Sequence, residues 1–131
     1  MINKDFLYAG AELDSASSEL LRKFHKEGWR FYGHHMTIHF GLSTLPKSTE
    51  MWLKDNVSKE YPLTIIAIGH SNKAIAALVK ENEIPCSNKL RHITVSVAPD
   101  GKPVDSNKIK EWQPIEPFTV ITNITVYQKT K

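Results

Sequence analysis

Two short segments of the chain have the same order of residue types: a histidine, an apolar residue, a threonine and an aliphatic residue. They are His35-Met36-Thr37-Ile38 and His92-Ile93-Thr94-Val95. An imidazole exchanges protons near neutrality, because its unperturbed pKa is about 6.5, and a threonine hydroxyl donates hydrogen bonds. Two such pairs around one phosphate meet the needs of phosphodiester cleavage. One imidazole takes a proton from the attacking oxygen, the other protonates the leaving oxygen, and the hydroxyls hold the non-bridging oxygens.

Both segments lie where apolar and polar residues alternate, which is typical of a half-buried strand. We expect strands over residues 34–40 and 90–98. Residues i and i+2 of a strand project to the same face, roughly 7 Å apart, and the residue between them points the other way. Each motif should therefore present its imidazole and hydroxyl side by side, with Met36 and Ile93 in the core. The pattern leaves open a second arrangement, in which the two pairs lie at separate surfaces on unrelated strands.

The rest of the sequence predicts one domain over residues 1–131, with strands and helices mixed along it. Apolar runs and alternation predict further strands over residues 6–13, 61–69, 74–80 and 118–127. Helices are expected from Asp14 or Ser15, as the capping residue, to about residue 27, and then over residues 46–60 and 104–111. This mixture favours an α+β fold with antiparallel sheet.

Composition narrows the class of protein. Hydrophobic residues make up 40% of the chain and charged residues 24%, which is ordinary for a globular protein. The net charge of +3 lacks the dense basic stripe of a duplex DNA-binding protein. We expect no membrane span, because no run of about 18 apolar residues occurs, and a cytoplasmic location, because residues 1–5 do not resemble a secretory signal. A single cysteine, Cys86, permits neither an internal disulfide nor a cysteine-rich zinc site.

The paired motifs resemble those of the 2H phosphoesterase superfamily, which includes RNA-ligase-like cyclic phosphodiesterases and the cyclic phosphodiesterase domains of fungal tRNA ligases. Residues 33–41 look like the first motif with its strand, and residues 91–97 look like the second. Residues 63–77 resemble the strand pair that joins the motifs in the tRNA-ligase type. The resemblance implies a bilobal α+β fold, with two antiparallel-sheet lobes flanked by helices around a central cleft.

The resemblance also implies an activity: metal-independent hydrolysis of 2′,3′-cyclic phosphates, or of related 2′-5′ and 3′-5′ nucleotide linkages, without a cofactor. Carried over by motif, the catalytic residues are His35, Thr37, His92 and Thr94. The short chain favours a small nucleotide or an RNA end as substrate. Two alternatives stay open, namely a non-catalytic module that binds a nucleotide or RNA end, and a structural protein whose motifs are coincidental. Which histidine acts as the acid, and the oligomeric state, are not determined by the sequence.

Four further residues are candidates for substrate binding: Tyr8, Tyr32, His39 and Arg91. The tyrosines would stack on a base, with core packing as the alternative. His39 shares the predicted strand face of the first motif, and it would contact substrate or lie in solvent at the strand end. Arg91 is positioned to bind phosphate, with an ordinary surface position as the alternative. No metal is expected, because no carboxylate accompanies these histidines.

Overall fold

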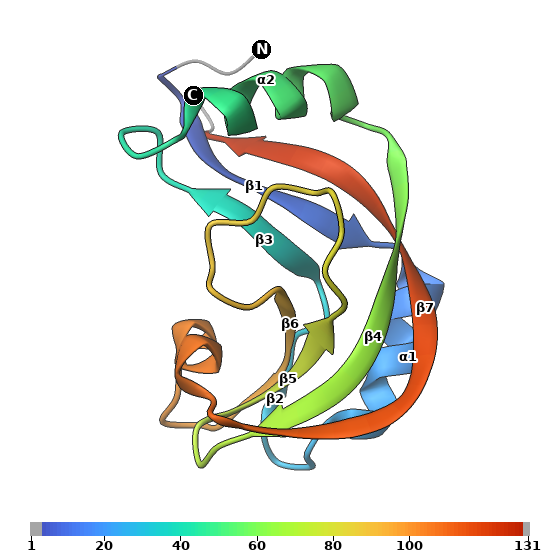
Figure 1. Cartoon of the computed structure of the whole chain (residues 1–131). Coiled ribbons are helices and arrows are strands. Elements are labelled where there is room, and N and C mark those ends of the chain that lie inside the picture. The colour runs from blue at the N-terminus through green and yellow to red at the C-terminus, as the bar shows by residue number, and fades with distance from the viewer. Residues whose placement is uncertain (1–3, 130–131) are drawn as a thin grey trace.

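Seven strands form one antiparallel sheet in the computed structural model, which describes residues 4–129 (Figure 1). In chain order they are β1 (Phe6–Leu13), β2 (Arg30–Phe31), β3 (His35–Phe40), β4 (Glu60–His70), β5 (Ala74–Val79), β6 (His92–Val97) and β7 (Glu111–Gln128). The helical elements are α1 (Ser15–Leu21), η1 (Arg22–Phe24), α2 (Lys47–Asn56) and η2 (Pro103–Lys108), of which η1 and η2 are 3₁₀-helices. Residues 1–3, part of the N-terminal segment considered above, lie outside the described residues.

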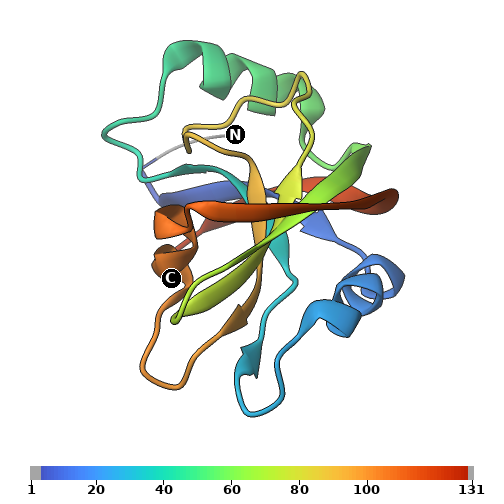
Figure 2. The ribbon, with the colours of Figure 1, turned by 60° about the horizontal axis from the view of Figure 1, so that its bottom comes forward.

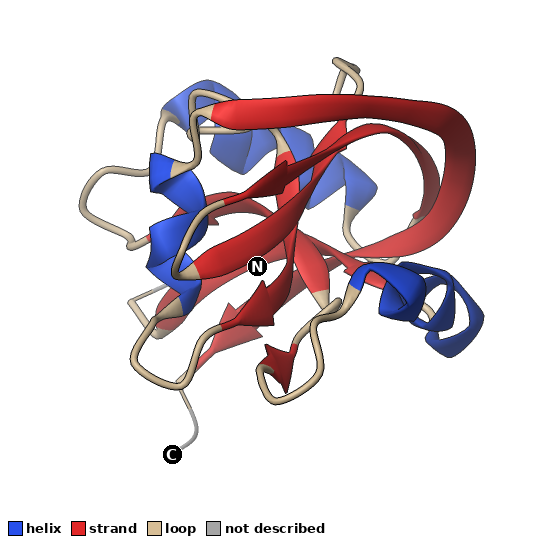
Figure 3. Ribbon diagram, turned by 90° about the horizontal axis from the view of Figure 1, so that it is seen from below, coloured by secondary structure: helices blue, strands red, loops and turns tan. Residues whose placement is uncertain are grey.

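The sheet closes on itself. Its strand order is β2-β6-β3-β1-β7-β4-β5, and β5 pairs again with β6. Six strands therefore make a closed barrel, and the two-residue β2 continues along β6 beyond β3. The strands cross and curve around a common interior (Figure 2), and the helices lie at the periphery (Figure 3). Closure removes most of the unpaired edges that an open sheet would expose.

The expected bilobal α+β fold is wrong. β4 and β7 form one long ribbon, which pairs from Glu60 opposite Asn123 to His70 opposite Glu111 with a single irregularity. β6 then pairs with both β3 and β5, so the two motif strands belong to the same ring. Because no break in hydrogen bonding separates two sheets, the molecule is a mostly β barrel with few helices.

Several local elements differ in length from their predictions. Asp14 caps α1 as expected, with the Ser17 N–H donating to its carboxylate at 2.8 Å, but the α-helix ends at Leu21. α2 ends at Asn56, since β4 begins at Glu60. β7 begins at Glu111 rather than near residue 118, despite Pro114. Its first half pairs with β4 alone, and proline is tolerated on such an edge because no donor is needed there.

The barrel interior is apolar and continuous from the motif strands to β4, β5 and β7. Its fully buried side chains include Met36, Ile38, Ile65, Ile93 and Val120.

None of the helices within residues 4–129 has the length and the apolar composition of a membrane-spanning segment.

Candidate active site

The two motif strands are neighbours in the barrel. Met36 of β3 pairs with Ile93 of β6, and both side chains are 0% exposed. This confirms that the middle residue of each motif faces the core. The strands are antiparallel, so each histidine lies beside the threonine of the other motif.

The two histidines therefore stand on a diagonal across the β3–β6 pair. Diagonal neighbours in an antiparallel sheet are about 7–8 Å apart, within reach of long side chains. All four motif side chains line a single cavity of about 620 Å³: His35, Thr37, His92 and Thr94. The structure thus brings the two motifs together and does not show two separate surface pairs.

His92 is held in one orientation by the main chain. Its Nδ1 donates a hydrogen bond to the Leu90 carbonyl at 3.0 Å, because a carbonyl oxygen can only accept. Nε2 is then the nitrogen that gains and loses a proton. Burial lowers the pKa of His92 below its ordinary value, and the bond to Leu90 opposes this effect only in part.

His35 is positioned by packing rather than by a hydrogen bond. Among the described residues, none donates to or accepts from its ring nitrogens, and the Tyr8 ring lies with its centroid 5.3 Å away. Burial lowers the pKa of His35, the nearby His34 lowers it further, and the carboxylate of Glu12 raises it in part. The imidazole of His35 is therefore free to meet a ligand with either nitrogen.

Gly10 provides the space that the His35 ring occupies. Gly10 lies on β1, opposite Thr37 of β3. A Cβ added at Gly10 would lie 3.1 Å from the Met36 carbonyl oxygen and 3.3 Å from His35 Cδ2. We predict that Gly10→Ala displaces the imidazole by a few tenths of an ångström and lowers kcat several-fold, because small misplacements of a reacting group are costly. Turnover and urea unfolding of the variant check this. Unchanged kcat in a folded Gly10→Ala protein would contradict it.

The two threonines differ in their partners. Thr94 Oγ1 shares a hydrogen bond of 2.9 Å with Ser106 Oγ, which is buried on η2. In the described part of the chain, the Thr37 hydroxyl has no such partner, so it is free to donate to a ligand. Ser106 belongs to no recognisable sequence motif, so the sequence did not identify it. It lies at the site because η2 packs against β6.

Aromatic rings form one wall of the cavity. Tyr8 stacks between Tyr127, at a centroid distance of 4.3 Å, and Phe40, at 6.0 Å. Phe40 lines the cavity although it is 70% exposed. Tyr8 and Tyr32 line the cavity as well, so the structure places both predicted tyrosines at the site. An exposed ring beside a stacked one is a surface on which a nucleobase can lie.

His39 does not line this cavity, although the alternation of β3 placed it there. Ala9 pairs with His39 but Gly10 pairs with Thr37, so Ile38 is an extra residue without a partner on β1. Such a bulge reverses the strand's alternation. His39 turns inward, where Nε2 lies 3.0 Å from Thr44 Oγ1, and Phe40 takes the face that the sequence assigned to His39.

Arg91 is also away from the cavity. Its guanidinium donates to the carbonyls of Asn82 and Ile84 at 3.2 and 2.8 Å, so it holds the loop before β6 rather than facing the motif residues. His34 lines the cavity, although on a regular strand it would face away from His35. The irregularity is Gly33, whose φ of +66° turns the chain just before β3.

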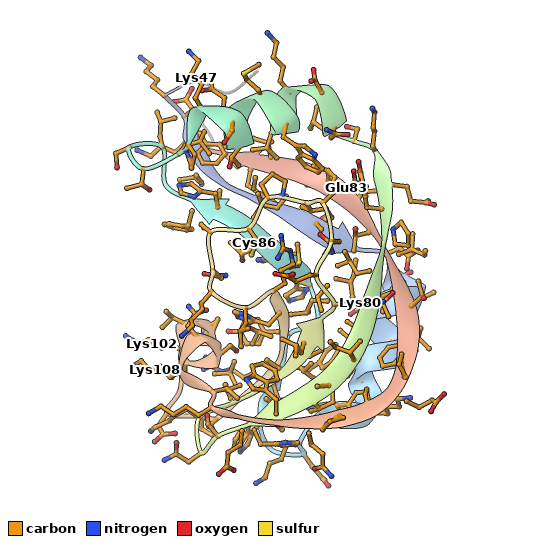
Figure 4. The ribbon with its side chains drawn as sticks, in the orientation of Figure 1. Lys47, Lys80, Glu83, Cys86, Lys102 and Lys108 are labelled. Atoms are coloured by element: carbon orange, nitrogen blue, oxygen red, sulfur yellow. The ribbon has the colours of Figure 1, made fainter. Side chains whose placement is uncertain are left out.

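The loop between β5 and β6 crosses β3 beside the motif, and Cys86 lies on it (Figure 4). The Cys86 thiol donates to the Thr37 carbonyl at 3.5 Å, and Ser87 Oγ donates to the Ile38 carbonyl at 3.1 Å. Burial raises the pKa of the Cys86 thiol, so it stays protonated near neutrality. This loop contributes Asn88 to the cavity lining, and η2 contributes Val104 and Asn107.

Within residues 4–129, no three His, Cys, Asp or Glu side chains lie together in a metal-binding arrangement. A search against protein-family models finds no match to the chain, and a search of curated proteins finds none either. Inferences about function therefore depend on the geometry of the site and on the motif resemblance.

Proposed function

We propose that the protein is a metal-independent phosphodiesterase that hydrolyses 2′,3′-cyclic phosphates or related 2′-5′ and 3′-5′ nucleotide linkages. The observation that carries this proposal is that two imidazoles and two hydroxyls from separate strands line one cavity. The diagonal arrangement sets one imidazole on each side of a phosphorus atom bound between the strands. That is the requirement for in-line attack with separate acid and base.

In the proposed reaction, the phosphate lies over the Met36–Ile93 pair. One imidazole takes a proton from water as the water oxygen bonds to phosphorus. The bond from phosphorus to the leaving ribose oxygen breaks, and the other imidazole gives that oxygen its proton. The Thr37 and Thr94 hydroxyls donate to the non-bridging oxygens, where negative charge develops. His92 exchanges its proton through Nε2, because Nδ1 is bonded to Leu90.

The aromatic wall supports a nucleotide as the substrate rather than a simple phosphate ester. Tyr8 and Phe40 offer a flat apolar surface at the rim, and base–aromatic stacking contributes about 1–3 kcal/mol per base. The cavity's volume, about 620 Å³, lies within the usual range for small-molecule sites, roughly 300–1,000 Å³.

The test is a substrate panel assayed with excess EDTA: nucleoside 2′,3′-cyclic phosphates, 2′-5′ and 3′-5′ oligoadenylates, and cyclic di- and trinucleotides. We expect turnover of at least one class, insensitive to EDTA, with products that are phosphomonoesters. Saturable binding of these compounds with no product after hours would instead support a binding module and would overturn the proposal.

A further inference from the structure

A second cavity, of about 590 Å³, adjoins the first on the far side of His92. The two share three lining residues, Asn88, His92 and Asn107, so the cavities are adjacent. Its walls come from the loop before β6, from η2 and from Trp112 at the start of β7. Apart from His92, no residue of either motif lines this cavity, and the proposed reaction uses none of its other lining residues.

The charge of the second cavity differs from that of the first. No Lys, Arg, Asp or Glu lines the first, whereas the second is lined by Lys89, Lys108 and Lys110 and by no acidic residue of the described chain. Lys108 has a partner, Asp105 at 3.6 Å, but its side chain is 77% exposed and the pair is weak in solvent. Lys89 and Lys110 form no ion pair within residues 4–129. Three lysines thus line the cavity, only one of them is paired with an acidic side chain, and this makes the cavity attractive to an anion.

The remaining lining residues include polar side chains, two aliphatic residues and one tryptophan. The amides of Asn88 and Asn107 sit on the boundary between the two cavities, and neither is used in a side-chain hydrogen bond within the described residues. The Trp112 ring packs against Ile109 and over Gly69, where an added Cβ would meet the ring at 2.6 Å. Lysines and an aromatic ring that line the same cavity suit a phosphate with an attached nucleoside.

We propose that this second cavity binds the phosphate next to the one that is cleaved, so that the preferred substrate is an oligonucleotide rather than a mononucleotide. The inference rests on the proposed phosphodiesterase activity. The phosphate to be cleaved lies between His35 and His92, and its neighbour along the strand lies against Lys89, Lys108 and Lys110. A mononucleoside cyclic phosphate would fill the first cavity and leave the lysines without a partner.

Pairs of substrates that differ by one phosphate test the inference, again with EDTA present. Adenosine 2′,3′-cyclic phosphate is compared with the dinucleotide that ends in the same cyclic phosphate, and dimers with trimers of 2′-5′ and 3′-5′ adenylate. We expect the longer member of the hydrolysed pair to have a kcat/KM at least about tenfold higher, because charge-assisted contacts to phosphate add to its binding.

The matched variants are two triple substitutions that each remove three exposed lysines. Lys89→Gln/Lys108→Gln/Lys110→Gln should abolish the advantage of the longer substrate and leave the shorter one within about twofold of wild type. The control, Lys47→Gln/Lys54→Gln/Lys59→Gln, should change neither, because these lysines line neither cavity. Lys47 lies on α2, at the opposite end of the molecule from Lys108 on η2 (Figure 4). All six side chains are exposed, so both proteins should fold as wild type.

The possible failures are distinct. Hydrolysis of short and long substrates with equal kcat/KM, unaffected by the first triple variant, would overturn the second-phosphate site and leave the phosphodiesterase proposal intact. Equal losses with both triple variants would show general electrostatic attraction and would also overturn it. If wild type hydrolyses neither member of any pair, the phosphodiesterase proposal itself fails, and this inference fails with it.

Discussion

His35→Ala and His92→Ala should each lower kcat by about 10²–10⁴-fold, the usual contribution of a positioned acid or base. In the proposed reaction each imidazole supplies one of the two proton transfers, and no other titratable side chain on β3 or β6 lines the cavity to replace it. The measurement is steady-state turnover of the best substrate with EDTA present. His70→Ala is the matched control, because His70 is exposed at the end of β4 and lines neither cavity; its turnover should equal that of wild type.

The double variant adds a sharper requirement. Groups that act in one concerted step are not additive, so His35→Ala/His92→Ala should be scarcely slower than the worse single variant. Unfolding in urea must accompany the kinetics, because His92→Ala also removes the bond to Leu90, worth roughly 0.5–1.5 kcal/mol. Near-normal turnover by either folded single variant would rule out the two-imidazole mechanism.

The strands that carry the site could be predicted because their signal is local. Alternation around Met36 and Ile93 fixes which residues face the core, and the same period places each histidine on the face of its threonine. Burial of both middle residues agrees with that expectation. The capping role of Asp14 was also predictable, since a short acidic side chain before a helical stretch has few other roles.

Closure of the barrel could not be predicted in the same way. It depends on β6 pairing with both β3 and β5, and on β4 pairing with β7 over its whole length. Those pairings join segments that are far apart in the chain, and the residue pattern of one strand does not predict which strand it pairs with. The first half of β7 was not predicted because it contains prolines, which indicate either an edge strand or a break in a strand. Only the structure shows that this half is an edge, since it pairs with β4 alone.

At His39 and His34 the site departs from strand alternation, and the cause in both cases is irregular backbone. The extra residue at Ile38 exchanges the faces of His39 and Phe40, and the positive φ of Gly33 brings His34 to the cavity. The first shifts the phase of β3 by one residue, and the second interrupts extended backbone just before β3. Alternation can be extrapolated only along a regular strand. The sequences of η2 and of the loop before β6 have no periodic pattern, so the sequence could not predict that Ser106 and Asn107 lie at the site.

The two histidines are equivalent by motif but not by environment. His92 and Thr94 are held by Leu90 and Ser106, whereas His35 and Thr37 have free polar groups. Burial lowers the pKa of both imidazoles, yet only His35 has charged neighbours that act on it with opposite signs. In the proposed reaction, the two limbs of the pH profile of activity therefore belong to two residues whose pKa values can be shifted separately by mutation.

We predict that kcat/KM is bell-shaped in pH, with its maximum on the acidic side of about 6.5, the ordinary histidine pKa. The base must be neutral, so activity rises with pH through its pKa. The acid must be protonated, so activity falls as the pH rises through the pKa of the acid. Because both values are lowered in the free protein, both limbs move to lower pH. A bound phosphate stabilises imidazolium and should move the kcat profile to higher pH than that of kcat/KM. Initial rates from about pH 4.5 to 8.5, at constant ionic strength, measure both.

Two variants of opposite sign assign the limb that belongs to His35. His34→Gln removes a charge that lowers the pKa of His35, so one limb should move to higher pH. Glu12→Gln removes a charge that raises it, so the same limb should move to lower pH. The other limb belongs to His92, whose pKa is set by burial and Leu90, and it should stay in place in both variants. The positions of the limbs, and not the absolute rates, decide the assignment. His34 itself lines the cavity, and Glu12 accepts a hydrogen bond from Tyr127, so both variants can also change the rate. Movement of both limbs together, or a kcat/KM maximum well above pH 7, would mean that these imidazoles are not the two groups whose protonation controls turnover.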